Sequence, residues 1–160
     1  GVFESRGVKI GVVNLQGRSR MQPIDCPFRG AREALRSLSK ETRLILVDFH
    51  AEDTEEKEAL GLYLDGDVTA LFGTHTHVAT ADERILPKGT AYITDIGATG
   101  PIESVIGFNP SISVERALTQ MPLRNEVAEG VAALNGVVIT AASESGRAVG
   151  IERFRAESSV

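Results

Sequence analysis

The chain has 160 residues, of which 42% are hydrophobic and 24% charged, a composition typical of one folded domain and unlike that of disordered chains. The net charge of -5 excludes the dense cationic face that general binding to nucleic-acid backbones needs. A single cysteine, Cys26, excludes an intrachain disulfide and favours a reducing compartment. We find no signal peptide and no apolar run near the roughly 20 residues of a membrane span. We therefore expect a cytoplasmic protein without a membrane partner.

The first half of the chain alternates between strand and helix patterns. Short runs of alternating or continuous apolar residues indicate strands, and the continuous run at 43–49 is typical of a strand covered on both faces. A stripe of Ala and Leu residues and a Thr-Glu-Glu start signal indicate two helices. Loops are expected over 14–27 and 78–89, where Gly and Pro interrupt the pattern. We expect strands over 7–13, 43–49, 68–72 and 90–94, with helices over 28–40 and 54–64.

The second half opens with a Gly-rich loop over 95–101 and returns to β character after one helix. We expect that helix over 111–121 and strands over 123–128, 133–142 and 148–155, the last two joined as a hairpin. Alternating strands and helices followed by β segments predict a layered α/β or α+β domain with mixed sheets. In such a fold, the loops after the strands of the first half meet at one rim.

All three histidines of the chain follow predicted strands. His50 comes directly after the run 43–49, while His75 and His77 follow the run 68–72. Open α/β sheets place their ligand sites at this edge, and His-x-His on an extended segment points both imidazoles to one side. Gly73 would let the chain turn sharply before them. We therefore predict that the three imidazoles converge on metal.

Nearby acidic residues fit a supporting role at this site. Asp48, Glu52 and Asp82 would orient the imidazoles by hydrogen bonds. Residue pattern alone leaves the metal hypothesis and a structural role for the histidines about equally favoured. A bridging carboxylate, which two-metal hydrolytic sites normally use, is not evident among the acids.

Three other segments carry weaker signals. The Gly-rich loop would present backbone amides to a phosphate, although a simple turn is favoured. Arg18 and Arg20 would clamp a phosphate or be solvated. Cys26 has no base near it in the sequence, which disfavours a thiol nucleophile.

Several segments together resemble a known family. They are Asn-Leu-Gln-Gly-Arg at 14–18, Asp-Phe-His-Ala-Glu at 48–52, Gly-Thr-His-Thr-His-Val at 73–78 with Thr-Ala-Asp at 80–82, and the stretch 85–95. Gly97, Thr-Gly-Pro at 99–101 and Val-Ala-Glu-Gly at 127–130 continue the match. In this order, from about residue 7 to residue 153, the chain resembles the YmdB-like family of calcineurin-type metallophosphoesterases.

The resemblance implies a four-layered α/β/β/α fold and a dinuclear metal site. His50 and His75 would bind one divalent metal and His77 the other, with iron or manganese expected and zinc as an option. The implied activity is metal-dependent hydrolysis of cyclic nucleotides, 2′,3′-cyclic ones favoured, by a metal-activated hydroxide. Thr99 and Gly100 would contact the substrate. Expected partners are this small nucleotide and, as an open option, further copies of the chain in a homo-oligomer.

One departure from the family pattern is large. The family's Asn-Gly-Glu-Asn and Gly-Asn-His motifs, which together with an N-terminal Gly-Asp motif supply the other metal ligands, the bridging acid and the catalytic histidine, are absent from residues 1–160, and the one Gly-Asp in this sequence, at 66–67, lies in the turn expected after the helix 54–64. The resemblance therefore implies that 1–160 is the C-terminal portion of one metallophosphoesterase domain. The histidine that protonates the leaving group would precede this sequence. The alternative hypothesis is a non-catalytic metal-binding or interaction module.

Overall fold

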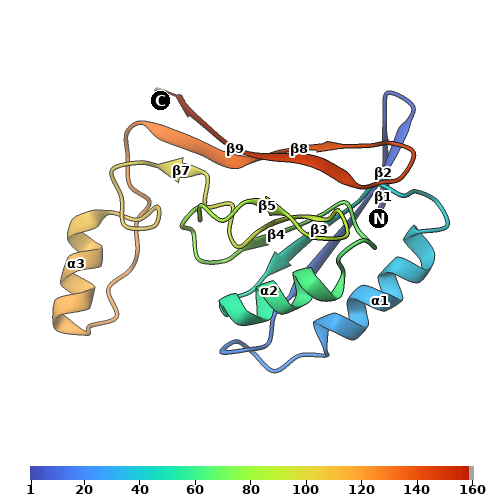
Figure 1. Cartoon of the computed structure of the whole chain (residues 1–160). Helices are drawn as coiled ribbons and strands as arrows, with labels where there is room; N and C mark the ends of the chain where they lie inside the picture. The colour runs from blue at the N-terminus through green and yellow to red at the C-terminus, as the bar shows by residue number, and fades with distance from the viewer. Residues whose placement is uncertain (159–160) are drawn as a thin grey trace.

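A computed structural model describes residues 1–158 and places a six-stranded sheet at the centre of the molecule (Figure 1). Four parallel strands form its middle, and an antiparallel strand lies at each edge. The strands in spatial order are β1 (Val2–Ser5), β2 (Val8–Gln16), β3 (Ile45–His50), β4 (Ala70–Thr74), β6 (Ala91–Ile93) and β5 (Arg84–Ile85).

Helices α1 (Pro27–Leu38) and α2 (Thr54–Tyr63) cover one face of this sheet (Figure 1). Pro27 opens α1, where its missing N–H costs no hydrogen bond. Asp53 caps α2 by accepting a hydrogen bond from the backbone N–H of Glu56 at 2.9 Å. The main core lies between these helices and the sheet, and its fully buried side chains include Phe49, Leu60 and Leu71.

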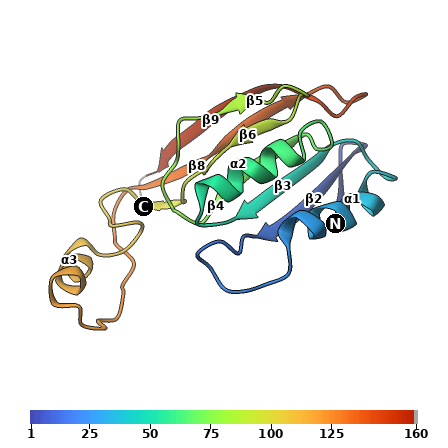
Figure 2. The same ribbon diagram turned by 60° about the horizontal axis from the view of Figure 1, so that its bottom comes forward.

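A second sheet packs on the opposite face, as Figures 1 and 2 show. It contains β7 (Gly100–Pro101), β8 (Ala132–Ala141) and β9 (Ala148–Ser158). Small side chains line the contact between the sheets, with Ala70, Ala91 and Ala148 buried there. The described residues thus form a mixed α/β fold with a helical layer and two sheet layers. The second helical layer of the expected four-layered sandwich stays a prediction.

Helix α3 (Pro110–Thr119) lies apart from both sheets (Figures 1 and 2). Asn109 caps it by accepting from the backbone N–H groups of Ser111 and Ile112. None of its residues is buried, and Leu118 is 79% exposed. The layered body therefore folds around a core in which α3 takes no part.

The expected helices and the β8–β9 hairpin are confirmed, but several β segments differ from expectation. Strand 123–128 does not form, and Val127 makes one isolated bridge with Phe108. The strand β2 continues through Gln16 into the expected loop, because β3 pairs with it along that length. The short strands β1, β5 and β7 were not expected, since two to four residues give almost no periodic signal. No helix within residues 1–158 is long and apolar enough to cross a membrane.

Candidate metal centre

The carboxyl ends of the parallel strands bring the first two histidines together. In the register of the sheet, Gln16 of β2 pairs with His50 of β3, and His50 pairs with Thr74 of β4. His75 follows Thr74 directly, so both imidazoles start from the same edge of the sheet. We expected this placement of the two residues at one edge of the sheet, and the strand register confirms it.

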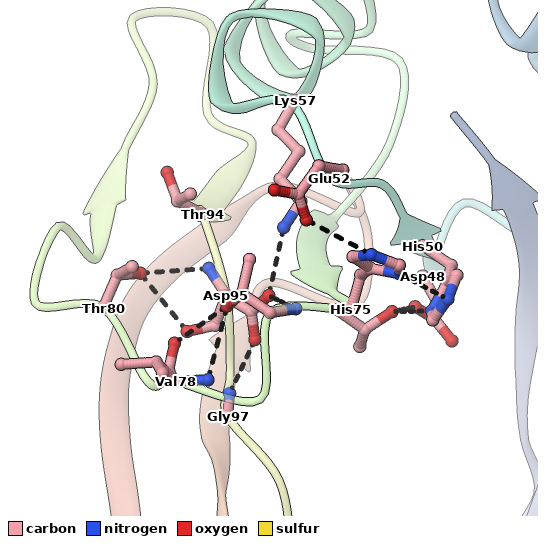
Figure 3. A network of polar contacts seen from close by, with 12 residues as sticks. Asp48, His50, Glu52, Lys57, His75, Val78, Thr80, Thr94, Asp95 and Gly97 are labelled. Atoms are coloured by element: carbon pink, nitrogen blue, oxygen red, sulfur yellow. Dashed lines mark hydrogen bonds and ion pairs between the residues drawn. The ribbon is translucent and has the colours of Figure 1, made fainter. Parts of the chain in front are cut away.

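A short hydrogen-bond chain holds the outer nitrogen of His50, which is Nδ1, the ring nitrogen that does not face His75 (Figure 3). His50 Nδ1 lies 3.2 Å from Thr74 Oγ1, and that hydroxyl donates to Asp48 Oδ1 at 3.0 Å. Asn14 Nδ2 donates to the other oxygen of Asp48 at 2.8 Å. Because the hydroxyl proton goes to the carboxylate, the hydroxyl oxygen accepts the proton of Nδ1. His50 Nε2 is then left with a free lone pair.

His75 brings a ring nitrogen to the same point. Its Nε2 lies 3.2 Å from Glu52 Oε2, and its Nδ1 lies 3.0 Å from His50 Nε2. The centroids of the two imidazole rings are 4.8 Å apart, and the angle between the ring planes is 81° (Figure 3). With Nε2–H donating to Glu52, the lone pairs of His75 Nδ1 and His50 Nε2 face each other. Such an arrangement requires a shared proton or a bound cation between the two nitrogens.

The donor set fits a divalent metal. Two nitrogens that bind one metal at about 2.1 Å and at right angles lie about 3.0 Å apart, the spacing that His50 Nε2 and His75 Nδ1 have. The partners of the outer nitrogens, Glu52 and the Thr74–Asp48 chain, are those that usually orient metal-bound histidines. Glu52 contacts His75 directly and Asp48 reaches His50 through Thr74, and their role toward a metal stays a prediction.

His77 lies in different surroundings. Its Nδ1 is 3.3 Å from the carbonyl oxygen of Ile106. The backbone φ is 107° at His75 and 65° at His77, so this stretch turns and does not follow the extended alternation that we expected. The predicted convergence of all three histidines is also not seen, because residues 1–158 contain no group of three or more His, Cys, Asp or Glu side chains arranged to hold a metal. The assignment of His77 to a second metal stays a prediction.

Gly73 allows two backbone segments to pack closely, whereas we expected it to allow a sharp turn. A Cβ atom at this position would lie 1.8 Å from the carbonyl oxygen of Thr94. The end of β4 therefore approaches the chain after β6 closely enough for Ile96 N to donate to Gly73 O at 3.0 Å. A residue with a side chain would push these two segments apart.

Asp82 does not contact a histidine and instead binds the end of β6. Its oxygens accept from Thr94 N at 3.2 Å and from Thr94 Oγ1 at 2.6 Å, and Arg84 Nη1 lies 3.3 Å away. Burial raises the pKa of this carboxyl, but hydrogen bonds from Thr80 and Thr94 outweigh burial and hold the pKa below its ordinary value. The expectation that Asp82 orients an imidazole is therefore wrong, because the loop after His77 folds back toward β6.

A buried ion pair that we did not predict from the sequence lies behind the histidines. Lys57 Nζ lies 3.0 Å from Asp95 Oδ2, and both side chains are almost completely buried. The sequence held a signal for it, because Lys57 precedes the core residues Leu60 and Leu64 by three and seven positions on one helical stripe. A lysine on the buried stripe of a helix needs an acidic partner.

The two arginines in the loop after β2 bind to the start of α2. Arg18 N donates to both carboxylate oxygens of Glu56, at 3.2 and 3.1 Å. Arg20 Nε lies 3.5 Å from Asp53 Oδ2, and the Arg20 side chain is largely exposed. These contacts hold the loop against the helix.

A hollow of about 590 Å³ adjoins His77. Thr99 and Gly100, the two expected substrate contacts, line it. Asn135 of β8 donates from Nδ2 to the carbonyl oxygen of Ala98 at 2.7 Å, which ties the Gly-rich loop to the second sheet. The remaining wall is largely apolar and contains Val78, Ile102, Ile106, Phe108 and Val127.

Comparison with known proteins identifies the family of this chain. A family model described as YmdB-like protein matches residues 1–154. The 2′,3′-cyclic-nucleotide 2′-phosphodiesterase of Bacillus subtilis (strain 168) is 50% identical over 151 residues, which make up 94% of this chain and 57% of that protein.

Two solved structures are similar along nearly the whole chain. A hypothetical protein from Thermus thermophilus has a TM-score of 0.91 at 39% identity, across 98% of this chain and 61% of that one. A novel phosphatase from Mycoplasma pneumoniae has a TM-score of 0.86 at 42% identity, across 98% of this chain and 56% of that one. The chain thus spans less than two thirds of the length of each of these relatives. The family match over residues 1–154 and the 50% identity to one member show that the chain belongs to the YmdB-like protein family.

Proposed function

We propose that this chain supplies one part of the active site of a metal-dependent phosphodiesterase that hydrolyses cyclic nucleotides, with 2′,3′-cyclic nucleotides favoured. The observation that carries the proposal is the close approach of two imidazole nitrogens, His50 Nε2 and His75 Nδ1, which lie 3.0 Å apart. The related Bacillus subtilis protein is named a 2′,3′-cyclic-nucleotide 2′-phosphodiesterase, which supports the choice of substrate. Because the chain spans 57% of that relative, the activity is proposed for the intact protein.

The residues that would hold a first metal are His50 and His75, with His77 assigned to a second. Imidazole nitrogens suit iron, manganese and zinc, and we propose iron or manganese first. Such ions supply Lewis-acid chemistry, which neutralises the charge that develops on a phosphate during hydrolysis. The chain itself would fix the tautomers, through Thr74 at His50 and through Glu52 at His75.

The hollow beside His77 would hold the nucleotide. Thr99 and Gly100 border it near His77 and would contact the phosphate or ribose. The apolar wall, which includes Phe108 and Val127, offers a surface on which a base would pack. Asn135 keeps the Gly-rich loop in place through its bond to Ala98, so the phosphate contacts stay beside the histidine.

The remaining ligands and the acid that protonates the leaving oxygen are proposed to come from residues outside this sequence. The described residues hold no cluster of three acidic, histidine or cysteine side chains around one point. Two imidazoles leave at least half of a metal's coordination positions open, since divalent metals bind four to six ligands. We therefore expect residues 1–160 alone to be inactive.

Hydrolysis of 2′,3′-cyclic AMP in the presence of Mn²⁺ or Fe²⁺ tests the proposal. The intact protein is compared with its His75→Ala variant and with Lys40→Ala, an exposed change at the end of α1. Loss of residues that orient a ligand costs about 10–100-fold, so we expect loss of the ligand His75 to cost at least about 100-fold. Lys40→Ala should retain full activity. Equal rates for His75→Ala and the unsubstituted protein would refute the assignment, and parallel assays on 3′,5′-cyclic AMP define the substrate preference.

A second candidate function is a non-catalytic metal-binding or interaction module. It is favoured by the same absence of a complete ligand cluster within residues 1–158. Metal titration of residues 1–160 separates the two functions. Weak binding that becomes tight in the intact protein supports the enzyme, whereas tight uptake of two metals by residues 1–160 alone would contradict our view that ligands are missing.

A further inference from the structure

Lys57 and Asp95 form an ion pair in the layer directly behind the histidine loop. The side chain of Lys57 is 0% exposed and that of Asp95 is 1% exposed, with Nζ and Oδ2 3.0 Å apart. Burying two charges in a protein interior is costly, and apolar residues of similar size would often stabilise a core as well. The pair therefore calls for an explanation other than core stability.

Asp95 does more than neutralise Lys57. Its Oδ2 also accepts from the backbone N–H of Thr76 at 3.1 Å, and its Oδ1 accepts from Gly97 N at 2.9 Å. Figure 3 shows the carboxylate between the loop that carries His75 and the loop that begins at Gly97. One side chain thus binds the loop of the candidate metal ligands and the loop of the candidate substrate contacts.

The bond to Thr76 falls at a strained point of the backbone. Residues on both sides of Thr76 have positive φ, 107° at His75 and 65° at His77. Residues with a side chain adopt such φ values at a cost in free energy and keep them only where the surroundings enforce them. The N–H between the two strained residues is the group that Asp95 holds.

Lys57 in turn holds Asp95 from the helix side. A Cβ atom on Gly73 would lie 3.0 Å from Lys57 Cδ, so the lysine stem runs just beneath the end of β4. The ammonium group then reaches the carboxylate without contacting water. Helix α2 is thereby connected through Lys57 and Asp95 to the turn that carries the histidines.

We propose that Lys57 and Asp95 are positioning residues, which hold the strained turn at 75–77 so that His75 and His77 face their metals. Asp95 would also fix the spacing between this turn and the loop of Thr99 and Gly100. This inference rests on the proposed function, because it assigns the pair a task toward the metal ligands. Apolar residues would fill the same space, but they would leave the N–H groups of Thr76 and Gly97 without acceptors.

The test separates hydrogen bonding from charge with two double variants of the intact protein. Lys57→Met with Asp95→Leu removes both charges and both acceptor oxygens, while Lys57→Met with Asp95→Asn removes both charges and keeps one oxygen. Mn²⁺ affinity is measured by calorimetry, and the electron paramagnetic resonance spectrum of bound Mn²⁺ reports the relative position of the ligands. Circular dichroism reports folding. Leu35→Ala serves as a control, because it destabilises the core beside α1 far from the histidines.

We expect at least about tenfold weaker Mn²⁺ binding and an altered spectrum for the Met–Leu variant, since two hydrogen bonds are lost. The Met–Asn variant should bind Mn²⁺ about two- to tenfold more weakly than the unsubstituted protein, because one hydrogen-bond acceptor is lost. Leu35→Ala should bind Mn²⁺ like the unsubstituted protein. Wild-type affinity and spectrum in a folded Met–Leu variant would overturn the proposal. If that variant does not fold, unchanged binding by the Met–Asn variant overturns it.

The same titration distinguishes a failure of this inference from a failure of the proposed function. If His75→Ala binds Mn²⁺ as tightly as the unsubstituted protein, the metal assignment itself is wrong and this inference falls with it. If His75→Ala loses Mn²⁺ but both double variants retain it, the metal assignment holds and the positioning role alone is refuted.

Discussion

The two halves of the candidate site are built by different means. His50 and His75 start from neighbouring parallel strands, and the register of the sheet and two side-chain hydrogen bonds determine their position. His77 and the first part of the Gly-rich loop lie beyond the parallel strands, beside an open hollow, and the end of that loop pairs with β8 as the two-residue strand β7. The strand half leaves no room for an added atom at Gly73, whereas Gly100 of the loop half has free space around it. We therefore expect the strand half, which long sheet pairing holds, to be more rigid than the loop half, which depends on the two-residue pairing of β7 with β8 and on a few individual contacts.

The largest expected effect is a loss of stability when a single methyl group is added to Gly73 in the strand half. Gly73→Ala would place a Cβ atom 1.8 Å from the carbonyl oxygen of Thr94, where neither backbone segment has room to move without breaking sheet pairing. Overpacking of this kind should lower the free energy of unfolding by about 3 kcal/mol or more. Urea unfolding followed by circular dichroism measures the change.

Gly100→Ala is the matched control for this substitution. A Cβ atom at Gly100 would meet no atom within 4 Å. We expect its free energy of unfolding to stay within about 0.5 kcal/mol of the unsubstituted protein. Comparable losses in the two variants would show that the strand half is no more rigid than the loop half.

The second prediction concerns the hydrogen-bond chain behind His50. Thr74→Val removes the hydroxyl between His50 Nδ1 and Asp48, so the tautomer that frees Nε2 is no longer enforced. Loss of such a partner should weaken metal binding about 10–100-fold. Mn²⁺ titration of the intact protein measures it. Thr76→Val provides the comparison in the loop half, because the Thr76 hydroxyl bonds to the backbone of Val78 and should affect affinity much less.

A smaller effect is expected in the loop half. Asn135→Ala removes the hydrogen bond of 2.7 Å to the carbonyl oxygen of Ala98 and loosens the loop that carries Thr99 and Gly100. One such bond is worth about 1 kcal/mol, so KM for 2′,3′-cyclic AMP should rise about fivefold while Mn²⁺ affinity stays unchanged. Steady-state kinetics with a parallel Mn²⁺ titration test this. A fall in metal affinity equal to that of Thr74→Val would show that the two halves are not independent.

The sequence predicted the strand half of this site far better than the loop half. His50 and His75 could be placed because strand ends follow from apolar periodicity, and parallel strands bring their ends to one edge. The turn at 75–77 could not, because positive φ at two histidines contradicts local preference and depends on a contact with Asp95, eighteen to twenty residues further along. The expectation for Asp82 was wrong for the same reason, since its partner Thr94 follows β6, twelve residues further along the chain. Contacts between loops have no period that a sequence pattern could reveal.

The smallest predicted effect is a pH dependence centred on Asp82, which fastens the loop after His77 to the end of β6. Burial raises the pKa of its carboxyl, but the hydrogen bonds from Thr80 and Thr94 prevail, so the folded-state pKa lies below the ordinary value of 3.8. The unfolded chain therefore takes up this proton first as the pH falls. The stabilisation by Asp82 should be fully present well above pH 3.8 and should be lost as the pH falls through the folded-state pKa. Asp82→Asn, which cannot titrate, should show a weaker loss of stability between pH 6 and pH 3 than the unsubstituted protein in urea unfolding. Parallel pH curves for the two proteins would mean that the carboxylate contributes nothing to holding this loop, and the loop half would then depend on its backbone contacts alone.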